Sequence, residues 1–333
     1  MTILARLRRA GIDTYTLLLL GMVLLGSILP ASGDFAVVVR TVSLLAVALL
    51  FFLYGARLDT STVIAGLANW RLQGLTFLTT FVFFPALALG IVLLVSGIVD
   101  PAIATGILFL GALPSTVQSS IALTGLARGN VAAAVCAASI SNLVGVVLSP
   151  LLCTLLVGSQ GGVDPAAIGS VALQILLPFV LGQLARPFIG NFVKQHRTLT
   201  LTVDRGSILL IVYSAFSAGM VSGVWTAVGL WPLLLTLGIA VAMFFIVVLF
   251  TGWAGRIAGL SEADRTTLLF CGSTKSLASG LPIATILFTG EAVSLIILPI
   301  MLYHQFQLVA CAIIAQRKAI RLESAQPPVL AGS

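Results

Sequence analysis

Ten long apolar stretches follow one another along the chain, and short segments between them carry most of the charges. Most stretches approach or exceed the ~20 residues that an α-helix needs to cross a bilayer. They are apolar on every side, which excludes a membrane β-barrel, because barrel strands alternate apolar and polar positions. The pattern predicts ten transmembrane helices, at Thr14–Pro30, Ala36–Ala56, Leu72–Ser96, Ala102–Ala127, Gly129–Val157, Ala166–Ala185, Ser207–Trp225, Trp231–Gly255, Thr266–Gly290 and Ala292–Gln316.

The composition agrees with this pattern. Of the 333 residues, 59% are hydrophobic and only 8% are charged, whereas about 25% are charged in an ordinary soluble domain. So few charges cannot cover the surface of a water-soluble fold. We therefore expect an all-α integral membrane protein embedded in a lipid bilayer.

The polar residues of the predicted spans exclude most enzyme chemistry. An enzyme needs a nucleophile with its base, paired carboxylates or metal ligands. All ten acidic residues lie in predicted loops or at span ends, and His304 is the one histidine within a span. The four cysteines lie within spans and lack the CxxC spacing of zinc sites. We predict no enzymatic activity, no cofactor and no metal site.

The cations predict the orientation of the chain. If the N-terminus is cytoplasmic, the inner loops collect 15 of the 17 lysines and arginines, as the positive-inside rule requires. Both termini are then cytoplasmic, in the cell membrane, which in a bacterium is the inner membrane. These cations are spread over short loops without a basic domain, so no nucleic-acid partner is expected. The two remaining cations are Arg40, near the outer end of its span, and Lys275, near the middle of the ninth span.

A basic segment at residues 186–205, predicted to be an inner loop, divides the ten spans into five and five. Because five is odd, the second half enters the membrane from the opposite side, as in the inverted repeats of secondary transporters. We expect residues 1–165 to form the first five-helix repeat and residues 166–321 the second. Residues 322–333 are expected to be a disordered cytoplasmic tail.

The fourth span of each half is interrupted near its middle. The first half has GALPSTVQSSIALTG, from Gly111 to Gly125, and the second has FCGSTKSLASG, from Phe270 to Gly280. Hydroxyl residues beside a proline or glycine are typical of discontinuous helices, whose unpaired backbone groups must line a cavity or hold a ligand. One such interruption is typical of a kink, but two at matching places favour a binding site.

The candidate substrate- or ion-binding residues lie at and around these two interruptions. Asn142 on the fifth span has two equally good interpretations, contact with substrate and hydrogen bonding between helices. A lone histidine such as His304 is more often structural than a proton relay. The candidates are Pro114, Ser115, Thr116, Gln118, Ser119, Ser120, Asn142, Gly272, Ser273, Thr274, Lys275, Ser276 and His304.

Lys275 has four interpretations at this stage. Its ammonium has three donors and can tether the carbonyl ends of the broken helices. It can instead bind an anionic substrate together with helix N-termini, or carry a proton during a transport cycle. A position nearer the inner surface would let it snorkel, although charged residues within a membrane are usually functional.

Several motifs carry a resemblance to a known family. The fourth span contains Pro114–Ser115–Thr116–Val117–Gln118–Ser119–Ser120, and the turn after it is Gly129–Asn130–Val131. With the runs CGSTKSLASG, LLPFVLGQLARP and LPIMLYHQFQL, they make nearly the whole chain similar to the bile acid:sodium symporter family, and most similar to its SBF-like branch. The resemblance implies two inverted repeats, with spans one, two, six and seven forming a panel and the others a core. It also implies that the broken helices cross in the core, and that alternating access moves an amphipathic organic anion.

The chain departs from the sodium-coupled members of that family. Where they present sodium ligands, this chain has Phe270, Thr274, Ala134, Ala138 and Thr80. Sodium is a hard cation that needs several oxygen ligands, so most of the implied sodium sites are missing. We therefore hypothesise that Lys275 supplies the positive charge that sodium supplies in the relatives.

Three functions remain open from the sequence. The first is a carrier of a small organic anion, bile-acid-like or otherwise amphipathic, that is independent of sodium and is coupled to a proton through Lys275. The second is a sodium symporter whose ions are held by carbonyls and hydroxyls alone. The third is a regulatory membrane protein that acts on calcium homeostasis without transport.

Overall fold

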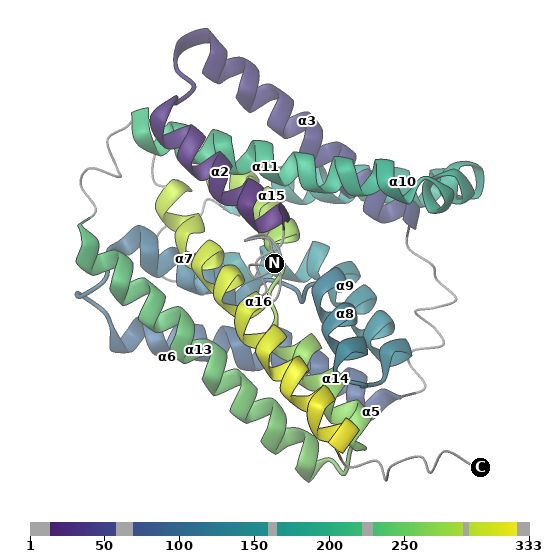
Figure 1. The fold of residues 1–333 in the computed structure, drawn as a ribbon. Coiled ribbons are helices and arrows are strands. Elements are labelled where there is room, and N and C mark those ends of the chain that lie inside the picture. The colour runs from purple at the N-terminus through teal and green to yellow at the C-terminus, as the bar shows by residue number, and fades with distance from the viewer. Residues whose placement is uncertain (1–13, 58–68, 159–164, 222–228, 289–292, 325–333) are drawn as a thin grey trace, which may run out of the picture.

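The computed structural model describes residues 14–57, 69–158, 165–221, 229–288 and 293–324, and every regular element in these ranges is helical (Figure 1). One short element, η1, is a π-helix that lies between α5 and α6. The elements are α2 (Thr14–Ile28), α3 (Gly33–Arg57), α5 (Trp70–Leu78), η1 (Thr79–Phe83), α6 (Phe84–Leu94), α7 (Pro101–Ala112), α8 (Gln118–Leu126), α9 (Val131–Gly158), α10 (Pro165–Gln195), α11 (Arg197–Val221), α13 (Leu230–Ile257), α14 (Glu262–Ser273), α15 (Leu277–Leu287) and α16 (Val293–Ser324).

Within the described ranges, six helical segments are long and apolar enough to cross a membrane. They are Gly33–Ala56, Trp70–Leu94, Val131–Val157, Thr198–Val221, Leu230–Ile257 and Val293–Arg321. The other four predicted spans correspond to α2, α10 and the pairs α7–α8 and α14–α15. The two pairs are each divided into short helices, so neither forms one continuous span. The protein is an all-helical integral membrane protein.

Large apolar side chains cover the outside of several helices. Leu155 of α9 is 72% exposed, Leu249 of α13 is 73% exposed and Phe188 of α10 is 87% exposed. Apolar surface on this scale is not stable in water and marks a surface that contacts lipid or another protein. Here it lies on helices of membrane-spanning length, which fits contact with lipid.

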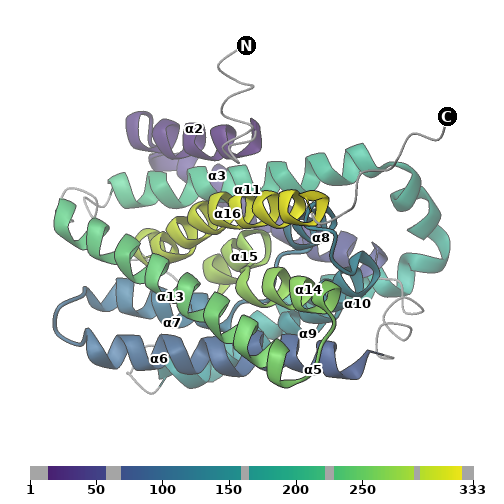
Figure 2. The ribbon, with the colours of Figure 1, turned by 60° about the horizontal axis from the view of Figure 1, so that its bottom comes forward.

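Four helices, α2, α3, α10 and α11, pack together, with α3 against α10 and α11 against both α2 and α3. Figure 2 shows α2, α3 and α11 together along one side of the molecule. Glycines allow the close approach of α3 and α10, because a Cβ at Gly182 would overlap the carbonyl of Phe52, and a Cβ at Gly55 would overlap that of Phe179. Small residues at a helix interface have this effect in membrane proteins generally.

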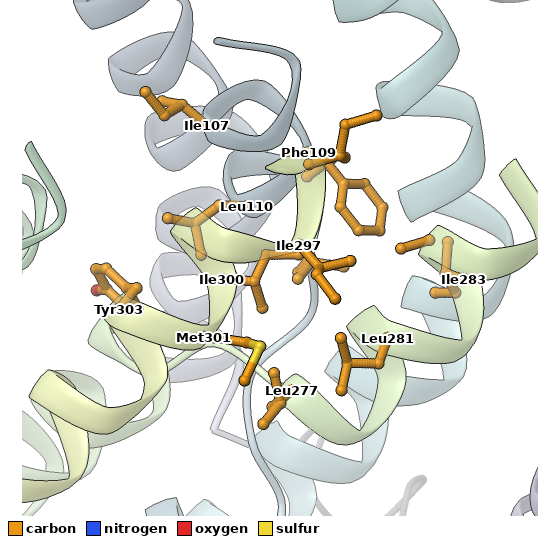
Figure 3. Close-up of a cluster of buried hydrophobic side chains, with 14 of the residues drawn as sticks. Ile107, Phe109, Leu110, Leu277, Leu281, Ile283, Ile297, Ile300, Met301 and Tyr303 are labelled. Carbon is orange, nitrogen blue, oxygen red and sulfur yellow. The ribbon is translucent and has the colours of Figure 1, made fainter. Parts of the chain in front are cut away.

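The largest buried cluster lies mainly among the remaining helices and extends to α3 and α11, which contribute Leu50 and Ile211. Figure 3 shows side chains of α7, α15 and α16 meeting there, among them Phe109, Leu281 and Ile297. Gly106 brings α7 directly against the backbone of Ile296 on α16. The four cysteines are all buried and free.

The prediction of a loop at residues 186–205 is wrong. α10 continues to Gln195 and α11 begins at Arg197, so the segment is helical on both sides of His196. At 1.5 Å per residue the 31-residue α10 is ~46 Å long, which exceeds the ~30 Å of a bilayer core. Charged residues mark the end of an apolar span, but lysine, arginine and glutamine are good helix formers, so the helix continues beyond it.

The predicted tail boundary also shifts. Residues 322–324 belong to α16, and residues 325–333 lie outside the described ranges. The cations of residues 1–13, which contribute to the predicted orientation, lie outside them as well.

Candidate functional site

Two of the predicted spans are each broken into two short helices, as the sequence predicts. α7 ends at Ala112 and α8 begins at Gln118, while α14 ends at Ser273 and α15 begins at Leu277. We name residues 113–117 the first linker and residues 274–276 the second linker. The backbone N–H of Ser276 donates a hydrogen bond to the carbonyl of Pro114 at 2.9 Å. The two linkers therefore lie against each other.

Local chemistry explains the first break. Pro114 has no N–H to continue α7, and its ring forces Leu113 out of the helical region, to φ −73° and ψ 152°. On the facing helix α9, Gly145 leaves room for the proline, since a Cβ there would lie 2.7 Å from the Cβ of Pro114.

The second break is completed by a serine cap and a glycine. The side chain of Ser276 accepts a hydrogen bond from the N–H of Ser279 at 3.1 Å and so caps α15. A Cβ at Gly280 would lie 2.6 Å from Cδ1 of Leu113 in the first linker. The glycine therefore permits contact between the two breaks.

Hydroxyl groups join the two linkers. The hydroxyl of Thr274 donates to the carbonyl of Phe270 at 2.8 Å, so it accepts from Ser115 and Thr116, each 3.1 Å away. All three threonine and serine side chains are buried. They hold the linkers together in this conformation.

Lys275 is 1% exposed at the centre of this arrangement. Its Nζ donates to the carbonyls of Thr80 at 3.0 Å, Gly111 at 2.9 Å and Leu113 at 2.6 Å. It also lies 4.0 Å from the ring centroid of Phe84. All three ammonium donors are satisfied by carbonyls, which are the contacts of a tether. The snorkelling interpretation is wrong, because the head group is enclosed.

Helix α16 pairs the backbone of the second linker. The N–H of Lys275 donates to Oε1 of Gln307 at 2.7 Å, and Nε2 of Gln307 donates to the carbonyl of Lys275 at 2.8 Å. The hydroxyl of Tyr303 donates to the carbonyl of Ser273 at 2.7 Å. Gln307 and Tyr303 are not among the predicted site residues. Their place in a long apolar run gives no sign of which backbone groups they meet.

His304 joins the same network. Its Nδ1 lies 2.9 Å from Nε2 of Gln307 and 3.3 Å from the carbonyl oxygen of Lys275. His304 thus serves a structural network in this conformation.

Asn142 connects α9 to both breaks. Its Nδ2 donates to the carbonyl of Ser115 at 2.8 Å, and its Oδ1 accepts from the hydroxyl of Ser279 at 2.9 Å. The neighbouring Ser141 accepts from the N–H of Ser115 at 3.0 Å. This geometry matches the interpretation of Asn142 as a residue that hydrogen-bonds between helices.

Most predicted site residues face the interior of the crossover. Gln118, at the start of α8, is exposed, while Ser119 beside it and Asn142 on α9 are half-buried. α8 begins there without a side-chain cap, so its first-turn N–H groups and the positive end of its dipole are available to an anion. The buried members are Pro114, Ser115, Thr116, Ser120, Gly272, Ser273, Thr274, Lys275, Ser276 and His304.

A charged cluster links the start of α14 to the end of α16. Glu262 pairs with Lys318 at 2.8 Å and with Arg265 one turn away. The hydrogen bond from Lys318 is the main reason that the pKa of Glu262 lies below its ordinary value. Nearby, Nδ2 of Asn130 donates to Asp264 at 2.9 Å and so joins α9 to α14.

Comparison with known proteins identifies the family of the chain. Residues 13–319 match the SBF-like CPA transporter family. The chain is 50% identical to "Uncharacterized protein PA2026" of Pseudomonas aeruginosa, over 94% of this chain and 95% of that protein. It is 43% identical to "Putative symporter YfeH" of Escherichia coli, over 95% of each chain. It is 31% identical to "Sodium/bile acid cotransporter 7" of Mus musculus, over 80% of each. The chain therefore belongs to the SBF-like CPA transporter family, whose members are transporters and not enzymes.

Proposed function

We propose that the protein is a secondary active transporter that moves a small organic anion across the membrane by alternating access. The observation that carries the proposal is the contact between two broken helices through their linkers. Unwound backbone inside a membrane protein is stable only where it is paired or lines a cavity, and transporters place their substrate sites at such breaks. The name of the mouse relative, a sodium/bile acid cotransporter, makes a bile-acid-like or other amphipathic anion the first cargo to test.

Residues 1–165 and 166–321 are then the two inverted repeats, each with a broken fourth span. The group α2, α3, α10 and α11 is the panel, and the other helices form the core that moves against it. Both termini lie in the cytoplasm and the protein resides in the cell membrane, which in a bacterium is the inner membrane. The cation distribution supports this orientation.

The substrate site in this proposal includes the start of α8. Its uncapped N-terminus attracts negative charge, and Gln118 and Ser119 supply the exposed polar groups beside it. The buried hydroxyls of both linkers become substrate contacts only when the linkers separate. Asn142 bridges the two breaks and is placed to respond to that separation.

The proposed carrier does not depend on sodium. The ammonium of Lys275 has three carbonyl partners, whereas a neutral amine has one donor fewer and turns a lone pair toward a carbonyl. This geometry favours a fixed charge in the observed conformation. Proton coupling through Lys275 requires another conformation, in which those carbonyls separate from Nζ.

Flux in proteoliposomes tests these proposals, with labelled taurocholate as the amphipathic probe. We expect counterflow of taurocholate that is unchanged when sodium is replaced by potassium. A pH series for the native protein and for the Lys275→Met and Lys275→Arg variants separates the roles of the lysine. If Lys275 carries a proton, arginine stalls the cycle, because arginine does not release its proton.

Other outcomes favour the rival functions. Strict sodium dependence in the native protein supports a sodium symporter with altered ion sites. Absence of counterflow for taurocholate and for a set of smaller organic anions supports a regulatory membrane protein.

A further inference from the structure

The head group of Lys275 lies among carbonyl oxygens that the helices themselves leave unpaired. We name the carbonyl oxygens of Thr80, Gly111 and Leu113, with the face of the Phe84 ring, the carbonyl cage. The oxygens lie 2.6 to 3.0 Å from Nζ and come from two separate segments of the chain.

The π-helix η1 explains why the Thr80 carbonyl is available. In an α-helix this oxygen would accept from the N–H of Phe84, but that N–H bonds the carbonyl of Thr79 instead. The next amide that could reach it in a π-helix belongs to residue 85, which is a proline without an N–H. The local sequence therefore leaves the Thr80 carbonyl without a backbone donor.

The end of α7 leaves the Gly111 carbonyl unpaired in a similar way. The residue three positions on is Pro114, which has no N–H. The residue four positions on is Ser115, whose N–H is used by the hydroxyl of Ser141. The hydroxyl of Thr80, which is 0% exposed, also has no hydrogen-bond partner within the described residues.

We propose that the carbonyl cage is a monovalent-cation site that the chain fills with its own ammonium, and that removal of the Lys275 side chain opens it to a free monovalent cation. Rings of backbone carbonyls replace the hydration shell of such ions in channels. A buried carbonyl without a donor is destabilising, so an empty cage with several of them favours the entry of a cation. The aromatic face of Phe84 adds attraction for any cation in that position. The proposal concerns cation binding and holds whatever the protein carries.

Thermal unfolding of purified protein tests the proposal. The four buried cysteines give a readout, because a thiol-reactive fluorophore reports their exposure on unfolding. We compare the native protein with Lys275→Ala, which empties the cage, and with Lys275→Met, whose uncharged chain still occupies it. Each is measured in chloride salts of sodium, potassium, methylammonium and choline at one ionic strength.

We expect the native midpoint to be the same in all four salts. The Lys275→Ala midpoint should be lowest in choline, and should rise by about 3–5 °C in a saturable way as sodium, potassium or methylammonium replaces choline. The Lys275→Met midpoint should be lowered without a specific response to these ions. Only an open cage can distinguish small cations from choline.

Three results overturn the proposal. They are an alanine variant that does not distinguish the salts, a methionine variant that responds as strongly as the alanine variant, and a native protein that sodium stabilises specifically. Where folding of Lys275→Ala depends on the salt present during purification, recovery in sodium but not in choline supports the cage. Failure of Lys275→Ala in every salt, while Lys275→Met folds, contradicts it.

Discussion

At Lys275 the cost of burying a charge is offset by contacts that lie far apart in sequence. The carbonyls of Gly111 and Leu113 lie at the end of α7, where the helix dipole is negative. The third carbonyl comes from η1, and the ring of Phe84 lies beneath the head group. An isolated ammonium inside a membrane protein would be unstable, but one with all its donors used can also fix the relative positions of several segments.

Gln307 is expected to be as important for stability as Lys275, because it pairs both backbone groups of that residue. Gln307→Ala leaves a buried N–H and a buried C=O unpaired, at about 1–3 kcal/mol each. We expect a fall of several degrees in the thermal midpoint of purified protein. The control is Gln305→Ala, at a half-buried position two residues away. Equal losses in the two variants would contradict the role of Gln307.

Residue chemistry predicts the breaks but not the partners of the broken segments. Pro114 and the polar residues around Lys275 predict the interruptions, because proline, glycine and hydroxyl residues disrupt a helix through local effects on its backbone. The partners Tyr303, Gln307 and Thr80 depend on which helix faces come together. In chains that are apolar on every side, the hydrophobic pattern does not specify those faces.

At the scale of elements, close helix contacts depend on glycine. A Cβ at Gly182 would overlap the Phe52 carbonyl, so α3 and α10 must separate in Gly182→Ala. A Cβ at Gly238 of α13 would have nothing within 4 Å, which makes Gly238→Ala a matched control. We expect overpacking in Gly182→Ala to lower the free energy of unfolding by about 1–3 kcal/mol. The thermal midpoint should fall accordingly. Gly238→Ala should be neutral or stabilising, since alanine is the better helix former.

If Gly182→Ala has the same thermal midpoint as the native protein, α3 does not pack on α10 as closely as the structure shows. A fluorescence-detected gel-filtration profile of both variants separates misfolding from a simple loss of stability.

The ends of α14 and α16 are joined by an interaction that depends on pH. The pKa of Glu262 lies below its ordinary value of 4.5, chiefly because Lys318 donates a hydrogen bond to it. A depressed pKa means that the contribution to stability is present above the ordinary value, and is lost as the pH falls through the folded-state pKa. Because the Glu262 side chain is 58% exposed, the loss should be below about 1 kcal/mol.

Thermal midpoints of the native protein and of Glu262→Gln, measured from pH 7 to pH 3, test this contribution. The native protein should be the more stable at pH 7, and the two curves should converge below pH 4.5. Lys318→Met removes the other member of the pair, so its thermal midpoint should also be lower than that of the native protein at pH 7 and should converge with it at low pH. Parallel curves across the whole range would show that the pair contributes nothing.

At the scale of the whole molecule, the group α2, α3, α10 and α11 packs as a unit beside the helices that hold the crossover. The sequence predicts this grouping only through the family resemblance, since apolar periodicity does not say which spans are neighbours. It predicts ten spans by counting apolar runs, and six described helical segments have the length and composition to cross a membrane. Counting cannot show where a span divides into two short helices or continues beyond the bilayer.

Alternating access requires the crossover to be reachable from one side at a time. In the observed conformation Ser119 is half-buried, whereas Ser276 is 4% exposed and bonded to the first linker. We place single cysteines at Ser119 and Ser276 in a background in which the four native cysteines are replaced by alanine or serine. Labelling from each side of the membrane then measures how accessible each position is.

We expect the cysteine at position 119 to react much faster than the one at position 276 without substrate, because position 276 is buried and its N–H is bonded to Pro114 of the first linker. A saturating amphipathic anion such as taurocholate should change both rates and reverse the side from which position 119 is labelled. Labelling of Arg256→Cys, at an exposed site in the last turn of α13, controls for general effects of the anion on the membrane. If neither site responds while the same protein sustains counterflow, substrate crosses without rocking of the core against the panel, and another route through the molecule must be sought.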